Sequence, residues 1–134
     1  MNDAATEARR WLAAARDDLE FSRHAAAGGY HAPACFYAQQ SAEKAVKALH
    51  FARGARAVIG HNIRSLIERL DPREPRLDRL VDDARELDLF YIPARYPNGL
   101  ETGTPGEAFS AAQSKRAIEL ATRFVETADA LLGH

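Results

Sequence analysis

Apolar residues recur every three or four positions along most of the chain, the spacing of one face of a helix. In residues 5–27 they form a single stripe, with charged residues outside it. No segment alternates apolar and polar residues every two positions, as a half-buried strand would. Further apolar stripes predict helices over about 32–53, 62–70, 75–91 and 104–132. The pattern predicts an all-α fold, an up-and-down antiparallel bundle of four long helices plus one short helix, as a single domain over residues 1–134.

Residues that start and stop helices support these bounds. Gly28 and Gly29 end the first helix, because glycine adopts the left-handed C-terminal conformation without steric cost. Asn62 is a good N-cap for the short helix. The segment 104–107 (TPGE) is a capping box with proline at the first helical position, and it predicts the start of the last helix. The segment 92–99 cannot be helical, since it holds two prolines and a glycine.

Composition narrows the classes of function. The chain has 134 residues and a formal net charge of −1, which gives no global reason to bind nucleic acid. Its single cysteine, Cys35, excludes an internal disulfide or a cysteine-based zinc site and favours a reducing, cytoplasmic setting. Neither a membrane-spanning apolar run nor a secretion signal is present. Scattered histidines and the lack of phosphate-binding, dinucleotide and nucleophile motifs predict no metal and no cofactor, and leave enzyme activity open.

Two groups of polar residues remain as candidates for chemistry. The first lies on the predicted second helix and consists of Gln39, Gln40, Glu43, Lys44 and Lys47. In its simplest interpretation, Glu43 and Lys47 form an ion pair on the helix surface that contributes about 0.3–0.5 kcal/mol.

The second group combines Asp88 with Arg95 and Tyr96. Asp88 falls within an apolar stripe, where a carboxylate needs a partner or contact with water. Arg95 is the nearest candidate in the sequence, and its planar guanidinium suits bidentate pairing with a carboxylate or a phosphate. The alternative is a purely structural Asp–Arg clamp that fixes the proline-rich loop.

The run 36–49 (FYAQQSAEKAVKAL) resembles the central helix of the HEPN domain family, the "higher eukaryotes and prokaryotes nucleotide-binding" domain. Three other segments are similar to family motifs and follow in the same order. They are Trp11 to Leu19, Gly60 to Leu66, and Leu87 to Pro97 with its Arg-Tyr-Pro loop. The resemblance covers about residues 8–132.

This resemblance implies an up-and-down helical bundle and a homodimer. It also implies a partner protein, since many small prokaryotic members are encoded beside a minimal nucleotidyltransferase, some as toxin–antitoxin pairs. One branch of the family is a metal-independent ribonuclease with an arginine followed by a histidine after four to six spacers. Arg95 has no such histidine, whereas Arg56 and His61 match the spacing in a different part of the chain. We interpret the chain as lacking the ribonuclease motif.

Three hypotheses follow. The leading one is a module without catalytic residues that binds a nucleotide, RNA or another phosphate-bearing ligand and acts with a partner such as a nucleotidyltransferase. The first alternative is a metal-independent ribonuclease toxin, with Arg56 or Arg95 stabilising charge and His61 as general acid or base. The second alternative is a purely structural dimerisation module. The ligand-binding residues of the leading hypothesis are Gln40, Lys44, Lys47, His61, Asp88, Arg95 and Tyr96.

Each main residue has an expected role in the leading hypothesis. The two lysines face a phosphate as point charges, and Arg95 clamps it in an orientation set by Asp88. Tyr96 stacks on a base. His61 donates a hydrogen bond at the edge of the site.

Overall fold

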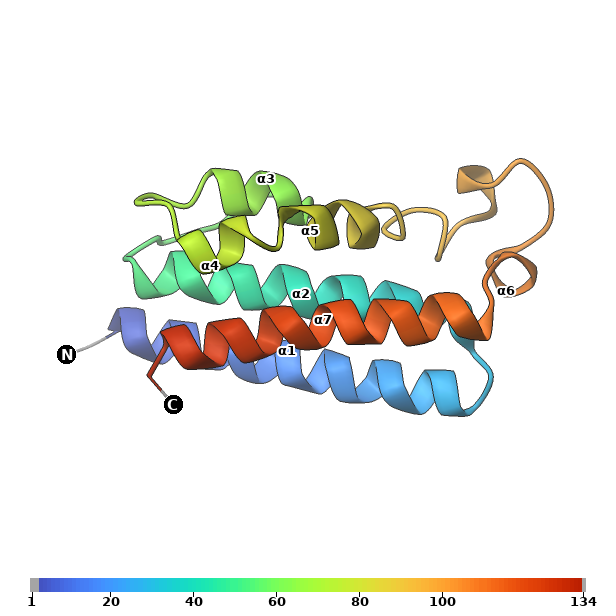
Figure 1. The fold of residues 1–134 in the computed structure, drawn as a ribbon, viewed down its shortest axis with the longest axis horizontal. Coiled ribbons are helices and arrows are strands. Elements are labelled where there is room, and N and C mark those ends of the chain that lie inside the picture. Colours follow the sequence, from blue (N-terminus) through green and yellow to red (C-terminus); the bar gives the residue numbers. More distant parts are fainter. Residues whose placement is uncertain (1–2, 134) are drawn as a thin grey trace.

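Three long helices form the body of the protein in the computed structural model, which describes residues 3–133. They are α1 (Asp3–Ala27), α2 (His31–Ala52) and α7 (Ala111–Leu131). Helices α1 and α2 run antiparallel, and α7 lies beside them (Figure 1). Gly29 adopts a φ of 85° in the turn between α1 and α2, as predicted from the glycine pair. The outermost residues of the predicted 1–134 domain, 1, 2 and 134, lie outside the described residues.

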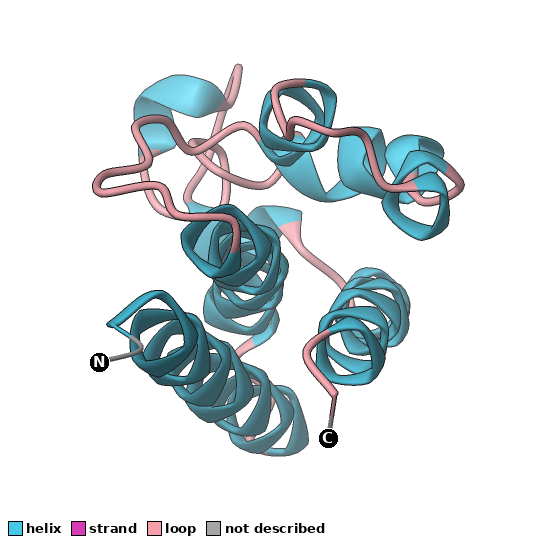
Figure 2. Ribbon diagram, turned by 90° about the vertical axis from the view of Figure 1, so that its left-hand side faces the viewer, coloured by secondary structure: helices cyan, strands magenta, loops and turns pink. Residues whose placement is uncertain are grey.

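Shorter elements form a second layer on the α2 side of the long helices (Figures 1 and 2). They are connected by loops, and no strand occurs within residues 3–133. None of the helices in this part of the chain has the length and apolarity needed to cross a membrane. The short elements are α3 (Ile63–Glu68), α4 (Pro75–Asp78), α5 (Val81–Asp88), the 3₁₀ helix η1 (Pro97–Gly99) and α6 (Pro105–Ala108).

Helix α2 is the long helix that faces the second layer, and it supplies the centre of the core. Its alanines 38, 42 and 45 are all but fully buried, and such small side chains let neighbouring helices approach closely. Phe124 and Leu120 of α7 pack into the same core as Leu87 of α5. Full burial of a large apolar side chain such as Phe124 contributes about 1.5–3 kcal/mol. The all-α prediction is therefore confirmed.

The helix predicted over 75–91 is divided. Helix α4 ends at Asp78, and α5 begins at Val81. Leu80 has φ −100° and ψ 9°, and its amide donates to the Leu77 carbonyl in a tight i→i−3 turn. The apolar period survives this turn because Leu77, Ala84 and Leu87 all remain buried in the core. Periodicity alone therefore could not distinguish one helix from two.

The start of the last long helix also differs from the prediction. The capping box of Thr104 and Glu107 is present, but it caps only the four-residue helix α6. A second capping box, formed by Ser110 and Gln113, starts α7. Extended backbone at Phe109 separates the two helices. The N-cap predicted at Asn62 is confirmed, since its side chain accepts a hydrogen bond from the Ser65 amide at 2.8 Å.

Candidate functional site

A buried polar group on α2 lies at the base of the site. Glu43 and Lys47 form an ion pair at 3.0 Å, with side chains only 3% and 6% exposed. The predicted pairing is present, but it lies in the interior and not on the helix surface. Buried charges are tolerated when they are paired and hydrogen-bonded. Glu43 meets this condition with two further donors, the Gln40 amide at 3.3 Å and His61 Nδ1 at 3.2 Å.

The neighbouring glutamines complete this network. Gln39 is fully buried, and its amide donates to the backbone carbonyl of His61 at 2.9 Å. Gln40 donates to the Gln39 side-chain oxygen at 2.7 Å. Within residues 3–133, no buried side-chain nitrogen or oxygen lacks a hydrogen-bond partner. These hydrogen bonds hold His61, just before α3, against α2.

The two lysines expected to face a phosphate have other contacts. The Lys47 ammonium lies 3.0 Å from Glu43 and 5.7 Å from the centroid of the Trp11 ring. Lys44 forms an ion pair with Asp18 of α1 at 2.6 Å. Both cations are therefore paired with carboxylates, Lys47 in the interior and Lys44 at a partly exposed position, and their role as phosphate-facing charges stays a prediction.

Asp88 lies at the C-terminal end of α5 and caps another helix. Its carboxylate accepts hydrogen bonds from the backbone amides of Ile63 at 2.7 Å and Arg64 at 3.1 Å. These are two of the amides that the first turn of α3 leaves without an intrahelical partner. Burial raises the pKa of the Asp88 carboxyl above its usual range, and the two backbone donors partly offset this. The predicted pairing of Asp88 with Arg95 is wrong, because α3 takes both carboxylate oxygens.

Arg95 lies among aromatic rings. Its Nε donates to the carbonyl of Tyr91, four residues earlier in the chain, at 2.9 Å. The guanidinium carbon lies 4.5 Å from the centroid of the Phe36 ring, 4.4 Å from that of Tyr91 and 4.8 Å from that of Tyr96. None of residues 3–133 accepts a hydrogen bond from the two terminal nitrogens of Arg95. Stacked and with free donors, this side chain suits recognition of an anion.

His61 also belongs to this aromatic group, because it stacks on Tyr91. Its ring stacks on Tyr91, with centroids 5.0 Å apart and planes 16° apart, and its side chain is 56% exposed. Tyr91 is therefore the shared neighbour of His61 and Arg95. Next to it is a cleft of about 430 Å³. The cleft is lined by His61, Asn62, Asp88, Leu89, Tyr91, Ile92 and Pro93.

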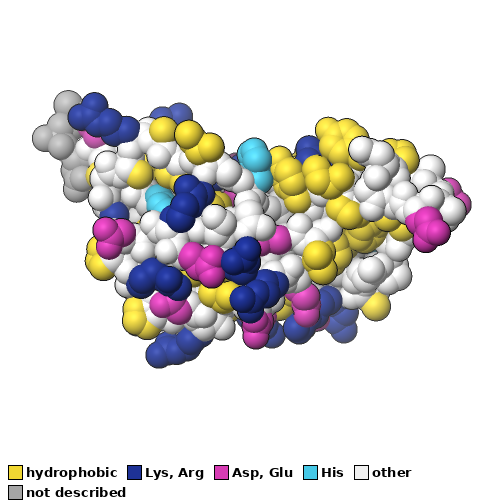
Figure 3. All heavy atoms as spheres, turned by 90° about the horizontal axis from the view of Figure 1, so that it is seen from above, with side chains coloured by type: hydrophobic (Ala, Val, Ile, Leu, Met, Phe, Trp, Pro, Cys, Tyr) yellow, Lys and Arg dark blue, Asp and Glu magenta, His cyan; other side chains and the backbone are white. Residues whose placement is uncertain are grey.

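The surface around this cleft is divided by chemistry. Seen from the side of the short elements, charged side chains gather on one half and apolar side chains on the other (Figure 3). Three apolar residues of the segment after α5 are well exposed: Leu89, Ile92 and Tyr96. The free guanidinium donors of Arg95 therefore lie within an apolar, aromatic neighbourhood, where an ionic hydrogen bond is stronger than in open water.

Arg56 does not join this site. It is exposed and lines a separate cleft with residues of α1 and the end of α2, including Glu7 and Phe51. His61 lines the cleft beside α5. The Arg56–His61 spacing in the sequence therefore does not bring these two side chains into one cleft. For the catalytic alternative, His61 and Arg95 remain, which each contact the ring of Tyr91.

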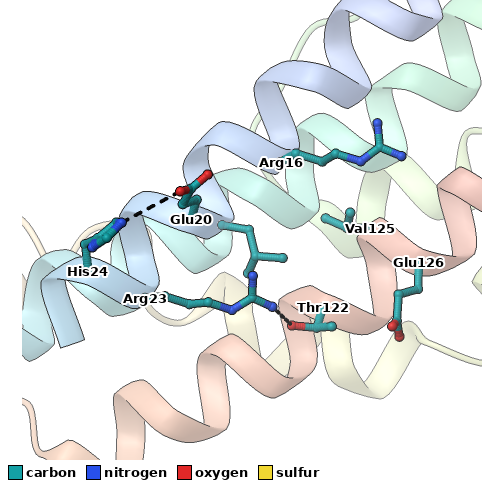
Figure 4. A pocket seen from close by; sticks show the side chains of 8 residues that line it. Arg16, Glu20, Arg23, His24, Thr122, Val125 and Glu126 are labelled. Atoms are coloured by element: carbon teal, nitrogen blue, oxygen red, sulfur yellow. Dashed lines mark hydrogen bonds and ion pairs between the residues drawn. The ribbon is translucent and has the colours of Figure 1, made fainter. Parts of the chain in front are cut away.

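A larger cleft, of about 590 Å³, lies between α1 and α7 (Figure 4). Its polar side chains are mostly used within the protein. Arg16 pairs with Asp129, and Arg23 donates to the Thr122 hydroxyl at 3.3 Å. His24 and Glu20 lie 3.8 Å apart on α1. We therefore take the smaller cleft as the candidate site, together with Arg95, which does not line the cleft but stacks on its lining residue Tyr91.

Residues 3–133 contain neither a metal site nor a reactive thiol. Within residues 3–133, no three His, Cys, Asp or Glu side chains are grouped closely enough to hold a metal ion. Cys35 is buried, and burial raises the pKa of its thiol to about 12. A thiol in this state is a poor nucleophile.

Sequence reasoning identified some of these residues and missed others. His61, Arg95 and Tyr96 do lie in one aromatic neighbourhood, although their function as ligand-binding residues stays a prediction. Tyr91 is the last residue of the helix predicted over 75–91, and its role as the shared neighbour of His61 and Arg95 was not predicted. The sequence held no clear signal for this contact. Side chains four residues apart meet on a helical turn, but the two prolines predict a loop after residue 91.

The comparisons with known proteins agree with this architecture. The sequence model of the HEPN domain family matches residues 8–131. The chain is thus a helical-bundle domain, and it belongs to the HEPN domain family. None of the curated proteins compared with the chain matches it significantly.

Several solved structures are similar over nearly their full length. TT1696 from Thermus thermophilus is 36% identical, with a TM-score of 0.86, and the match covers 97% of this chain and 98% of that one. ST0689, an archaeal HEPN homologue, is 33% identical with a TM-score of 0.77 over 94% and 98%. The HEPN domain protein tm0613 from Thermotoga maritima is 32% identical with a TM-score of 0.73 over 93% and 98%.

Proposed function

We propose that this HEPN domain binds a nucleotide or another phosphate-bearing ligand at the cleft beside His61, Tyr91 and Arg95. One observation carries the proposal: the stacked Arg95 guanidinium has two terminal nitrogens without a partner in the described chain. A planar guanidinium with free donors matches the oxygens of a phosphate in a bidentate geometry. The exposed ring of Tyr96 and the apolar cleft supply surfaces on which a base can stack.

The ligand-binding role is joined to a role with partners. Family membership supports action beside a minimal nucleotidyltransferase, as in a toxin–antitoxin-like pair, and a homodimer as the working form. The exposed apolar residues Leu89 and Ile92 beside the cleft are the surface best suited to such contacts. The buried, unpaired Cys35 fits a reducing compartment, and we propose the cytoplasm.

A thermal-shift titration with ATP, GTP, AMP and a short RNA tests the binding proposal. A ligand that binds only the folded state, at 100 times its dissociation constant, adds about 2.7 kcal/mol and raises Tm by several degrees in a domain of this size. We expect the shift to disappear in Arg95→Ala. It should persist in the control Arg9→Ala, because Arg9 is an exposed residue of α1 away from the cleft.

Two results would contradict the proposal. The first is no shift with any of the four ligands at millimolar concentration. The second is an equal shift in wild type and Arg95→Ala. The first would favour the purely structural dimerisation module, and a change of oligomeric state in variants of Leu89 and Ile92 would then be its positive test. The second would show that a ligand binds at a site that does not use Arg95.

A second candidate is the metal-independent ribonuclease, and one observation favours it. The buried Glu43 carboxylate holds His61 Nδ1, which leaves Nε2 available at the exposed side of a ring that shares Tyr91 with Arg95. A histidine oriented by a carboxylate is a common general acid or base. Cleavage of RNA in excess chelator, lost in His61→Ala and retained in His24→Ala, would establish this activity. Intact RNA after prolonged incubation would exclude it under those conditions.

A further inference from the structure

His61 has one ring nitrogen turned towards the interior and one left for the cleft. Nδ1 lies 3.2 and 3.3 Å from the two oxygens of Glu43, a side chain that is 3% exposed. Glu43 is paired with the Lys47 ammonium, and as a carboxylate it can only accept hydrogen bonds. Nδ1 is therefore the donor in this contact and carries a hydrogen.

The second nitrogen is then determined by the chemistry of imidazole. A neutral ring has a single N–H, so Nε2 presents a lone pair when Nδ1 carries the hydrogen. The oxygens of an ionised phosphate also present only lone pairs. A phosphate can form a hydrogen bond with Nε2 only if the ring takes up a second proton, and imidazole is the side chain that does so near neutral pH.

We propose that the cleft binds a phosphate group beside His61 only when this ring is an imidazolium, so that nucleotide binding takes up one proton. This inference rests on the proposed nucleotide-binding function. It makes Glu43 a positioning residue, because Glu43 selects which ring nitrogen is free.

The other charged groups near the ring fit this coupling. The Glu43–Lys47 pair has no net charge, and Asp88 lines the same cleft, where its carboxylate favours an imidazolium and disfavours a phosphate. Proton uptake by His61 offsets the negative charge of Asp88 when the ligand enters, and Arg95 adds a fixed positive charge. The titratable or charged groups near His61 come from every neighbouring element. They are Glu43 and Lys47 of α2, Arg64 of α3, Arg69 at the end of α3, Asp88 of α5, and Tyr91 and Arg95 of the following segment.

The proposal predicts a definite dependence of affinity on pH. At pH values where the ring of the free protein is neutral, affinity for a phosphate ligand should fall about tenfold for each further unit of pH. A ligand without phosphate should show no such dependence, because Nε2 can accept a hydrogen bond from a hydroxyl or amino group when the ring is neutral.

Calorimetric titration of the full chain with the methyl ester of AMP tests the coupling. This phosphodiester keeps one negative charge across the range, so its own ionisation does not contribute. Repeating the titration at pH 8.5 in buffers of different ionisation enthalpy counts the protons taken up by a ring that is neutral before the ligand binds. We expect about one for wild type and for the control His24→Gln, which changes an exposed histidine of the α1–α7 cleft. We expect no proton uptake for His61→Gln, because the glutamine amide donates a hydrogen bond without taking up a proton.

A second measurement needs no ligand. Long-range ¹H–¹⁵N spectra of the free protein at pH 8.5 report which nitrogen of His61 carries the hydrogen, and we expect Nδ1. A hydrogen on Nε2 would overturn the proposal directly, as would nucleotide binding with equal affinity from pH 6 to 9. Failure of the proposed function looks different, because then no nucleotide binds at any pH and the inference falls with it. If AMP binds but its ester does not, the difference in proton uptake between wild type and His61→Gln provides the same test.

Discussion

Two cations of this protein lie beside aromatic rings, Lys47 beneath the surface of the long-helix layer and Arg95 in the short-helix layer. Lys47 lies 5.7 Å from the Trp11 ring centroid and is neutralised by Glu43. Arg95 lies against three rings and has no carboxylate partner within residues 3–133. The same type of contact therefore serves packing in one layer and leaves hydrogen-bond donors available in the other. Four substitutions test this difference.

The largest effect should come from Lys47→Met. It leaves the Glu43 carboxylate buried without its cation, which typically costs about 3–5 kcal/mol in the free energy of unfolding. Urea denaturation followed by circular dichroism measures this loss. The double variant Glu43→Leu, Lys47→Met should recover much of it, because an apolar pair removes the unpaired charge. A loss below about 1 kcal/mol for the single variant would mean that Lys47 is not needed to neutralise the interior.

The next effect concerns Asp88, which links the two layers by capping α3. Asp88→Asn keeps at most one of the two acceptors and should cost about 1–2 kcal/mol at neutral pH. Burial raises the Asp88 pKa, so the folded state binds this proton more tightly than the unfolded state does. The contribution of Asp88 to the free energy of unfolding therefore falls as pH rises above about 4. The cost of Asp88→Asn should accordingly be larger at pH 4 than at pH 7, and a constant cost would contradict the raised pKa.

A smaller effect on stability is expected for Arg95→Ala. The variant loses the stacking of an accessible cation on aromatic rings, which contributes about 0.5–1 kcal/mol. Its effect on ligand binding should be complete, as described for the thermal-shift titration. Denaturation and titration of the same sample separate the two. A loss of stability as large as that of Lys47→Met would mean that Arg95, like Lys47, serves mainly to stabilise the fold.

The smallest effect should come from Lys44→Ala. Lys44 and Asp18 are more accessible than the buried pair, with side chains 28% and 14% exposed. Solvent screens such a pair, and its removal should cost less than about 1 kcal/mol with no change in nucleotide affinity. Weakened binding in Lys44→Ala would support the expectation that this lysine faces a phosphate.

The long helices could be predicted from the sequence because their patterns are unambiguous. Apolar spacing along each helix and the turn at Gly29 are local signals, and these local preferences agree with the tertiary packing. The helices of the short layer were harder to predict, because their local signals are ambiguous. The turn at Leu80 preserves the apolar period, and two capping boxes follow closely at Thr104 and Ser110, so local signals could not show where helices were interrupted.

The site was predicted only in part, because its contacts join distant segments. The sequence suggested Arg95 as the partner of Asp88, seven residues away, whereas the actual partners are amides of α3 about 25 residues earlier. Backbone amides at the start of a helix cannot be recognised as donors from residue type, because every residue except proline has one. Burial of Lys47 was equally invisible, since the spacing of Glu43 and Lys47 is the same on a surface helix and on a central one.

The pairing of Lys47 with Trp11 has a consequence for spectroscopy. Trp11 is the only tryptophan of the chain, and it stacks on Phe51 with ring centroids 5.1 Å apart. From its indole, a continuous series of contacts leads through Lys47 and Glu43 to the ring of His61 at the cleft. The native fluorescence of this one residue therefore comes from the far end of the polar network, and it offers a label-free optical signal for events at a cleft that the tryptophan does not line.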